Sequence, residues 1–294
     1  MKISVVTPSY NQAEFLDRTI RSVLCQDYPD LEYLILDGGS TDGSLAIIEA
    51  YADHLTYWRS TPDDGQAAAV AEGLARATGD ILCYLNSDDL LAPDCLQRVA
   101  TAFAQNPTVD MVFSNRCIVD PGDRITGFWL LPPLTGPLLQ AWPLLPQETC
   151  FWRRNLMARA GNVDVSLRFA LDYDLFVRFL RHGRCCKLPG FLAAFRRHAQ
   201  AKSTHSYQTI GLAEVGQIRR RYRLRRDPVS RFLGRAIGEY SYWAGAVWGA
   251  AACWRSGTAY HIGQDFNVIW HGALRAETWL PPPPRGSLSP PNPP

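Results

Sequence analysis

The chain has 294 residues and is nearly neutral, with 30 Lys and Arg residues against 28 Asp and Glu residues and a formal net charge of +2. This balance argues against a dedicated nucleic-acid-binding protein, and 47% hydrophobic residues are typical of an ordinary globular protein. Eight cysteines at irregular spacings, without a CxxC pair, argue against a zinc site or a disulfide framework and favour a reducing compartment.

The first residues and the apolar stretches favour a cytoplasmic location. No signal-peptide pattern opens the chain. Its longest apolar stretch, residues 242–254, is shorter than the roughly 20 residues that a membrane-spanning helix needs. We therefore expect a cytoplasmic protein, either free or in peripheral contact with the inner face of a membrane.

Strands and helices are expected to alternate over the first 115 residues. Short apolar runs predict buried strands at 3–7, 31–36, 55–58, 81–85 and 110–113. Helical patterns follow Asn11 and the loop 37–43, and further helices are predicted at about 66–77 and 93–104. This alternation predicts an α/β fold with a mainly parallel, doubly wound sheet that is flanked by helices and joined by right-handed crossovers.

The alternation lapses after residue 115. Residues 127–146 are rich in proline, leucine and tryptophan and are expected to form an irregular loop. Helices are predicted at 151–160 and 171–182, and a strand is predicted at 192–195.

A helical extension is expected at the C-terminal end of the chain. Residues 214–235 predict a helix dense in arginine, which either lies on an anionic membrane surface or exposes a solvated face. The sequence leaves both explanations open. The proline-rich tail from residue 281 is expected to be disordered.

Polar segments follow three of the predicted strands, at 8–11, 37–43 and 86–89. In a doubly wound sheet these strand ends converge on one edge, where ligands bind. Asp88 and Asp89 at that edge suit a hard divalent cation that also binds phosphate. Capping of the following helix is the alternative explanation for the same two residues.

Three common motifs are missing from the sequence. Pro-Ser-Tyr-Asn follows the first predicted strand, where a nicotinamide site would have G-x-G-x-x-G. The sequence also contains no P-loop and no G-x-S-x-G nucleophile elbow. A dinucleotide-dependent dehydrogenase, a P-loop enzyme and an α/β-hydrolase are therefore excluded.

Eight motifs occur in one order along the chain. They lie at 7–11 (TPSYN), 36–43 (LDGGSTDG), 63–66 (DDGQ), 86–89 (NSDD), 147–154 (QETCFWRR), 161–164 (GNVD), 170–175 (ALDYDL) and 195–198 (FRRH). Their order and spacing resemble the family 2 glycosyltransferases, which are inverting enzymes with the Rossmann-like GT-A fold. The resemblance covers about the first 205 residues.

The resemblance implies a nucleotide-sugar site, a metal site and a catalytic base. The residues implied to contact the nucleotide-sugar are Thr7, Pro8, Ser9, Tyr10, Asp37, Gly65, Gln66, Asn86, Ser87 and Asp88. Within that set, Tyr10 would lie against the base and Asp37 would hydrogen-bond the uracil or ribose. Asp89, ahead of Asp88, would bind Mg²⁺ or Mn²⁺ on the diphosphate together with His198. Asp172 matches the family's catalytic base.

These roles agree with the chemistry of an inverting transfer. Departure of a nucleoside diphosphate leaves charge that a divalent cation neutralises as a Lewis acid. Inversion needs a base on the opposite side of the sugar that accepts the proton of the acceptor hydroxyl, which is the role implied for Asp172. Without the resemblance, Asp172 and Asp174 would equally well compensate a helix dipole, and Asp174 remains the fallback candidate for the base.

Four positions depart from the family pattern. Asn86 stands at the first acidic position of the DxDD pattern, a common variation. Ala68 and Ala71 stand where relatives often carry Asp and Asn, and Leu171 replaces a glutamate. These departures keep open a non-catalytic, degenerate glycosyltransferase that acts as a binding or scaffold protein. A sugar-phosphate nucleotidyltransferase is disfavoured, because it would need a glycine-rich loop with a basic residue after the first strand.

The resemblance thus predicts a hexosyl- or related glycosyltransferase that takes its sugar from a UDP-sugar or another nucleotide-sugar. The acceptor is expected to be a glycan or a lipid-linked hydroxyl, in cell-surface polysaccharide or glycolipid synthesis. The chain is divided into a GT-A domain (1–204), a helical extension (205–280) and a disordered tail (281–294). Within the domain, residues 1–115 would bind the nucleotide-sugar, and residues 116–204 would carry the acceptor site and the base.

Overall fold

The computed structural model describes residues 1–131, 145–202 and 206–224, together with positions 140, 232, 236 and 266. Its strands are β1 (Ile3–Ser9), β2 (Leu31–Asp37), β3 (Tyr57–Ser60), β4 (Ile81–Tyr84), β5 (Leu90–Leu91), β6 (Met111–Val119), β7 (Ile125–Trp129), β8 (Phe151–Arg153) and β9 (Cys185–Arg196). These described strands form one mixed sheet in the order β3-β2-β1-β4-β8-β6-β9-β5, with β7 paired to β6. The pairs β3-β2, β2-β1 and β1-β4 are parallel, as predicted for the first 115 residues.

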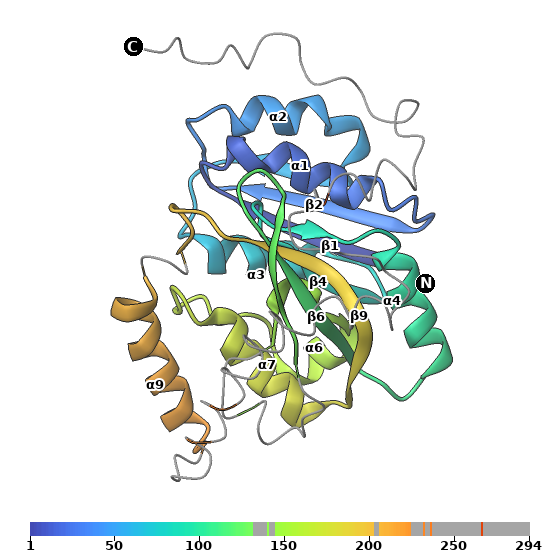
Figure 1. Ribbon diagram of the computed structural model, residues 1–294, viewed down its shortest axis with the longest axis vertical. Helices are drawn as coiled ribbons and strands as arrows, with labels where there is room; N and C mark the ends of the chain where they lie inside the picture. The colour runs from blue at the N-terminus through green and yellow to red at the C-terminus, as the bar shows by residue number, and fades with distance from the viewer. Residues whose placement is uncertain are drawn as a thin grey trace.

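Helices cover both faces of this sheet. The α-helices are α1 (Ala13–Leu24), α2 (Ser44–Ala50), α3 (Gln66–Arg76), α4 (Cys95–Gln105), α6 (Arg154–Ala160), α7 (Leu171–His182) and α9 (Leu212–Arg221). Shorter turns are η1 (Ala52–His54), η2 (Gln147–Thr149) and the π-helical η3 (Tyr207–Gly211). Figure 1 shows α1 and α2 above the sheet and α3, α6 and α7 below it, with α9 beside α7.

Burial explains why these segments fold as they do. Strand β1 is buried along its whole length, because a parallel strand inside a doubly wound sheet is covered on both faces. Helix α3 approaches β1 so closely that a Cβ at Gly73 would lie 2.3 Å from Val6 Cγ1. The small residues of α3 therefore allow the helix to pack directly on the strands that end at the site.

The second half of the sheet differs from the sequence prediction in two places. Residues 151–153 were expected to start a helix, but they form β8, which pairs antiparallel with β4 and β6. Phe151 and Trp152 are fully buried there, and the pairing partners outweigh the local helical pattern. The strand expected at 192–195 is the last third of β9, which runs for 12 residues and pairs in parallel with β6.

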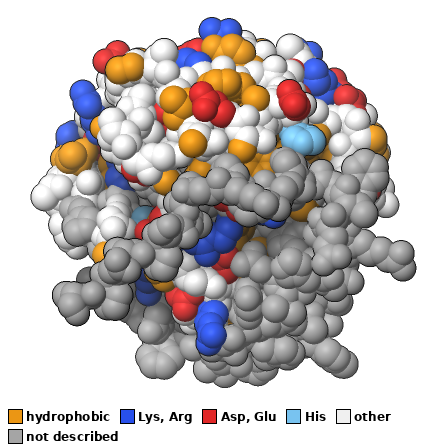
Figure 2. Space-filling view, turned by 90° about the horizontal axis from the view of Figure 1, so that it is seen from above, with side chains coloured by type: hydrophobic (Ala, Val, Ile, Leu, Met, Phe, Trp, Pro, Cys, Tyr) orange, Lys and Arg blue, Asp and Glu red, His pale blue; other side chains and the backbone are white. Residues whose placement is uncertain are grey.

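Several expectations fall wholly or partly outside the described residues. They concern most of the irregular loop 127–146, the helix 214–235 beyond residue 224, and the tail 281–294. No helix in the described part of the chain is long and apolar enough to cross a membrane. On the face shown in Figure 2, acidic and basic side chains are interspersed, in keeping with the near-neutral net charge.

Candidate active site

The polar segments predicted to converge do lie at one edge of the sheet. Strand β1 pairs in parallel with β2 on one side and with β4 on the other. Ser9 at the end of β1 is opposite Asp37 at the end of β2, and the loop from Asn86 to Asp89 follows β4. Since parallel strands end at the same edge, these segments lie together at the edge where open α/β sheets bind their ligands.

Tyr10 and Ser9 present groups that a ligand can contact. Tyr10 is 63% exposed, and its ring lies over Gly38, where a Cβ would be 3.3 Å from Tyr10 Cδ2 and 3.2 Å from Asp63 Oδ1. A side chain at this position would be in tight contact with the ring and the carboxylate. The buried Ser9 hydroxyl has no hydrogen-bond partner among the described residues, although such groups normally find one.

Other predicted nucleotide contacts are turned into the protein. Asp37 is fully buried, and its carboxylate accepts hydrogen bonds from the N–H groups of Gly39 (3.1 Å) and Ser40 (2.9 Å) and from the Ser60 hydroxyl (2.7 Å). The Thr7 hydroxyl is buried 3.1 Å from the Tyr33 hydroxyl. In this structure Asp37 and Thr7 hold the strand ends and the loop, and their contact with a nucleotide stays a prediction.

Asp88 and His198 meet across the site. His198 Nε2 lies 3.0 Å from Asp88 Oδ2, and this carboxylate raises the pKa of His198. The His198 ring packs against the Phe15 ring of α1, with centroids 4.6 Å apart. Two of the residues that the sequence analysis assigned to the diphosphate and the metal are thus in direct contact.

Asp89 lies behind this pair and is 1% exposed. Its Oδ1 accepts the N–H of Arg196 at 3.0 Å, and its Oδ2 is 3.4 Å from the side-chain nitrogen of Asn86. Burial, together with the carboxylates of Asp88 and Glu148, raises the pKa of Asp89 well above its usual range. This concentration of negative charge suits a bound cation, which would lower the pKa of Asp89 again.

The described residues do not by themselves form a chelating cluster. No group of three His, Cys, Asp or Glu side chains in the described part of the chain is arranged to hold a metal ion. A magnesium-type site that uses one or two carboxylates and takes its remaining ligands from substrate phosphates has the donor set found here. Asp88, Asp89 and His198 therefore fit a divalent cation that binds together with a diphosphate.

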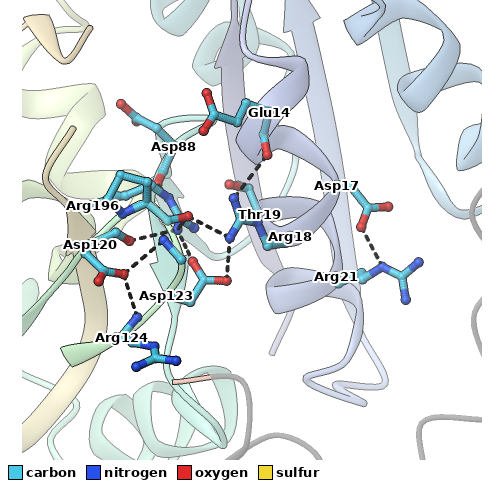
Figure 3. Close-up of polar contacts among 12 residues, drawn as sticks. Glu14, Asp17, Arg18, Thr19, Arg21, Asp88, Asp120, Asp123, Arg124 and Arg196 are labelled. Carbon is cyan, nitrogen blue, oxygen red and sulfur yellow. Dashed lines mark hydrogen bonds and ion pairs between the residues drawn. The ribbon is translucent and has the colours of Figure 1, made fainter. Parts of the chain in front are cut away.

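Arg196 fixes the loop that carries the two aspartates. It is fully buried, its Nε donates to the Asp88 carbonyl at 2.8 Å, and its guanidinium forms a buried ion pair with Asp123. The second Asp123 oxygen pairs with Arg18 of α1 at 2.9 Å, as Figure 3 shows. Phe266, from the C-terminal region, donates its N–H to the Asp123 carbonyl at 2.8 Å.

Three amide side chains form a connected series of hydrogen bonds between the segments of the site. Gln66 donates to Asn86 Oδ1 at 2.7 Å, and Asn86 donates to Gln147 at 3.1 Å. Gln147 in turn donates to the Tyr84 carbonyl at 2.6 Å. At the other end, Lys202 Nζ donates to Gln66 Oε1 at 2.9 Å, which brings the segment after β9 to the Gly65-Gln66 turn.

Asp172, in the first turn of α7, has the properties of a base. It is partly exposed, and its Oδ1 accepts the N–H of Tyr173 at 2.7 Å. Burial, with a smaller contribution from Glu148, raises the pKa of Asp172 to about 6, while the hydrogen bond from the Tyr173 N–H and the charge of Arg116 oppose the rise. A carboxyl with a pKa near neutrality is suited to accept a proton from a substrate.

Asp174 is occupied by structural contacts. It is 1% exposed, it pairs with Arg178 at 2.8 Å and Arg221 at 3.3 Å, and it accepts the Tyr222 hydroxyl at 3.0 Å. A carboxylate with these three partners is poorly placed to take up a proton from a substrate. The geometry therefore favours Asp172 over its neighbour.

Glu148 connects the two halves of the site and was given no role from the sequence. This buried carboxyl contributes to the raised pKa of both Asp89 and Asp172, and the neighbouring Gln147 accepts the Asn86 amide at 3.1 Å, beside the loop that carries Asp89. Its nearest cation is Arg116, 3.5 Å away, whose guanidinium packs 4.5 Å from the Phe195 ring centroid. Glu148 lies in the 147–154 motif, so the motif could have identified it as a site residue. Arg116 and Lys202 lie in none of the motifs, and no local sequence pattern indicated that they belong to the site.

Comparisons with known proteins agree with this geometry. The model of the family described as "Glycosyl transferase family 2" matches residues 4–153. An uncharacterized glycosyltransferase of Mycobacterium tuberculosis is 30% identical over 185 residues, which are 60% of this chain and 68% of that protein. The chondroitin synthase of Escherichia coli is 29% identical over 188 residues, which are 62% of this chain but only 27% of that enzyme.

Solved structures with the same fold include two with bound donors. The mannosyltransferase PcManGT of Pyrobaculum calidifontis, in complex with GDP-Man and Mn²⁺, superimposes with a TM-score of 0.59 and 23% identity over 92% of this chain and 79% of that one. Residues 1–349 of S. aureus TarS, in complex with UDP-GlcNAc, give a TM-score of 0.58 and 21% identity. That match covers 70% of this chain and 62% of the TarS chain.

Proposed function

The chain belongs to glycosyl transferase family 2 and is a nucleotide-sugar glycosyltransferase with the GT-A fold, and from this premise we propose that it transfers a sugar to an acceptor hydroxyl with inversion. One observation carries the proposal: His198 Nε2 contacts Asp88 Oδ2 at 3.0 Å where the strands end, and Asn86 of the same loop donates to Gln147 at 3.1 Å, next to Glu148. Glu148 in turn contributes to the raised pKa of Asp172. A diphosphate-binding group and a base around one centre are what an inverting transfer requires.

On the donor side, Asp88 and His198 are the residues proposed to hold Mg²⁺ or Mn²⁺, with Asp89 behind them. Asp88 is the more accessible aspartate and contacts His198, whereas Asp89 Oδ1 is used by the Arg196 N–H. This geometry favours Asp88 over Asp89 as the direct ligand, which reverses the order expected from the sequence. When bound, the cation would neutralise charge on the departing diphosphate.

On the acceptor side, Asp172 is proposed as the general base. The acceptor oxygen forms a bond to the anomeric carbon while the bond from that carbon to the diphosphate oxygen breaks. The electron pair of the broken bond leaves with the nucleoside diphosphate, and the acceptor proton passes to the Asp172 carboxylate. The pKa of Asp172, raised to about 6, leaves the carboxylate ionised at neutral pH and still basic enough to take part.

The donor is proposed to be a UDP-sugar bound with its base against Tyr10. The exposed Tyr10 ring over Gly38 and the unpaired Ser9 hydroxyl support a nucleotide contact at this place. The TarS structure holds UDP-GlcNAc and the PcManGT structure holds GDP-Man, so uridine and guanosine donors are the two to compare.

The acceptor is proposed to be a glycan or lipid-linked hydroxyl, in the synthesis of a cell-surface polysaccharide or glycolipid. The chondroitin and hyaluronan synthases among the relatives support a glycan acceptor. The basic end of α9, where the exposed Arg220 follows Arg219, supports a peripheral contact with an anionic membrane.

A donor screen tests the proposal. The protein is incubated with UDP- and GDP-sugars and Mn²⁺, and release of the nucleoside diphosphate is measured with and without candidate glycan acceptors. The expected result is metal-dependent release that prefers a UDP-sugar. Tight UDP binding without any turnover, in the presence of acceptor, would instead support the non-catalytic reading that Ala68, Ala71 and Leu171 kept open.

A further inference from the structure

The segment that leads into α7 is held by a residue from a distant helix. Ala170, the N-cap residue of α7, makes no capping hydrogen bond with its side chain. The N–H groups of Arg168, Phe169 and Ala170 instead donate to the carboxylate of Glu214 in α9, at 2.7, 2.9 and 2.8 Å. The entry to the helix that carries Asp172 is thus fixed from 44 or more positions away in the sequence.

Burial makes this contact a strong one. Glu214 is 8% exposed, and a buried carboxylate that accepts three backbone N–H groups is stabilised by charge-assisted hydrogen bonds. Burial lowers the pKa of Lys202, and the nearby carboxylates of Glu214 and Asp172 partly oppose this shift. Glu214 and Asp172 are therefore within electrostatic reach of one cation, which also contacts Gln66 on the donor side.

Packing at both ends of α9 keeps Glu214 in place. A Cβ at Gly211 would lie 2.8 Å from Phe169 Cδ1, so the close approach of the π-helical turn to Phe169 requires a glycine. At the other end, Arg221 and the Tyr222 hydroxyl bind Asp174 of α7 at 3.3 and 3.0 Å. Helix α9 thus contacts the α7 segment at two places, through Glu214 just before the first turn and through Arg221 and Tyr222 at Asp174.

We propose that Glu214 is a positioning residue for Asp172. By fixing residues 168–170, Glu214 sets the position and orientation of the first turn of α7. Helix α9 would then contribute to catalysis through the position of Asp172. The inference rests on the proposed role of Asp172 as base. Because a displacement of about 1 Å can cost on the order of 10²-fold in rate, a residue that does not touch the substrate can act in this way.

Glu214 also places a negative charge at the N-terminal end of α7. The positive end of a helix dipole favours an ionised carboxylate nearby, and a compensating negative charge weakens that effect. The other charged groups that act on Asp172 are Glu148 from η2, Arg116 from β6 and Lys202 from the segment after β9. Removal of Glu214 is therefore expected to loosen the position of Asp172 and, by the helix-dipole argument, to favour its ionised form.

The test compares Glu214→Ala, Glu214→Gln and Asp172→Asn with the wild-type chain. Glu214→Ala is expected to lower kcat by about 10-fold or more, to leave the donor KM within about twofold, and to move the acid limb of the kcat profile to lower pH. Glu214→Gln keeps one acceptor oxygen, which can serve the Phe169 and Ala170 N–H groups but not Arg168 as well, and is expected to recover part of kcat. UDP binding and the thermal unfolding midpoint establish that each variant is folded.

Arg221→Ala is the matched control, because it weakens the other end of the α9–α7 contact without touching residues 168–170. It is expected to lower stability with no shift of the pH profile. Wild-type kcat and pH profile in Glu214→Ala would overturn the inference, and so would equal kinetic effects of Glu214→Ala and Arg221→Ala. Full activity of Asp172→Asn, by contrast, would remove the proposed base itself, so the two failures are distinguishable.

Discussion

His198 Nε2 lies 3.0 Å from Asp88 Oδ2, although 110 positions of sequence separate the two residues. The contact joins the loop after β4 to the residues that follow β9, and the Phe15 ring of α1 supports the histidine. Three segments of chain therefore meet at the place where the diphosphate and its cation are proposed to bind.

Asp88→Asn is expected to remove the metal dependence of nucleotide binding while leaving the fold intact. Asp88 is partly exposed, and an asparagine side chain can still form a hydrogen bond with His198 Nε2, so the change removes a charged cation ligand and keeps this contact. Titration calorimetry with UDP, with and without Mn²⁺, measures the effect. If Mn²⁺ increased the UDP affinity of Asp88→Asn as much as that of the wild type, Asp89 would be the direct ligand instead.

Asp89→Asn is expected to stabilise the metal-free protein while abolishing turnover. The Asp89 carboxyl is buried beside Asp88 and Glu148, whereas an asparagine oxygen still accepts the Arg196 N–H without the charge. A gain of about 0.5–2 kcal/mol in the free energy of unfolding is expected, as for other replacements that relieve a destabilised active site. Urea denaturation at neutral pH, with EDTA present, measures it, and a loss of stability would contradict the argument.

Asp172→Asn is expected to keep donor binding and lose transfer. An amide fills the same space but cannot accept the acceptor proton, so kcat should fall by about 10²–10⁴-fold, the usual contribution of a general base. UDP affinity by calorimetry and product formation by chromatography separate the two effects. Asp174→Asn is the control. Because Asp174 pairs with Arg178, Arg221 and Tyr222, this variant is expected to be less stable than wild type but to keep its kcat at a temperature where it is folded.

The pH dependence of kcat follows from the same carboxyl. The pKa of Asp172 is raised from its ordinary value to about 6, so the base is ionised above that pH and protonated below it. Transfer is expected to fall as pH drops through about 6, with the acid limb absent in Asp172→Asn. Because the folded protein holds this proton more tightly than the unfolded chain, Asp172 also makes stability decrease as pH rises from about 4 to 6.

Local pattern predicted most strands and helices of the first half of the molecule and, in the second half, α7 and parts of α6 and β9, but it missed the short strands. The apolar face of α1 and the parallel strands β1, β2 and β4 follow from periodicity, because each is decided by its own residues. Strands β5, β7 and β8 contain two, five and three residues. Such short strands are stabilised by pairing with neighbouring strands, so their own sequences carry no pattern that predicts them.

The site shows the same division. The motif order identified Asp88, Asp89, His198 and Asp172, and the structure brings Asp88 and His198 into contact. The motif order did not reveal that the Asp37 side chain is turned inward or that Glu214 holds the entry to α7, because both features depend on neighbours elsewhere in the chain. The assignment of residues 205–280 to a separate extension remains a prediction, although α9 contacts α7 at both ends.

Asp123→Asn is expected to destabilise the protein and weaken the metal-dependent step together. Asp123 and Arg196 are both fully buried, and loss of one partner leaves the other charge buried, which costs about 3–5 kcal/mol. Arg196 also holds Asp88 and Asp89 through its Nε and N–H, so a displaced guanidinium disturbs the cation ligands. Urea denaturation and Mn²⁺-dependent UDP binding are the two measurements.

Asp30→Asn is the control for this last variant, because its ion pair with the N-terminus is long at 3.8 Å and its side chain is 54% exposed. An exposed pair contributes about 0–1 kcal/mol, so the control should lie close to wild type in both measurements. Asp123 also has a φ of +66°, a strained value for a residue other than glycine, which the buried ion pair and the turn at 120–124 maintain. If Asp123→Asn bound UDP with an unchanged response to Mn²⁺ despite its lower stability, the Arg196 clamp would be structural and without influence on the cation site.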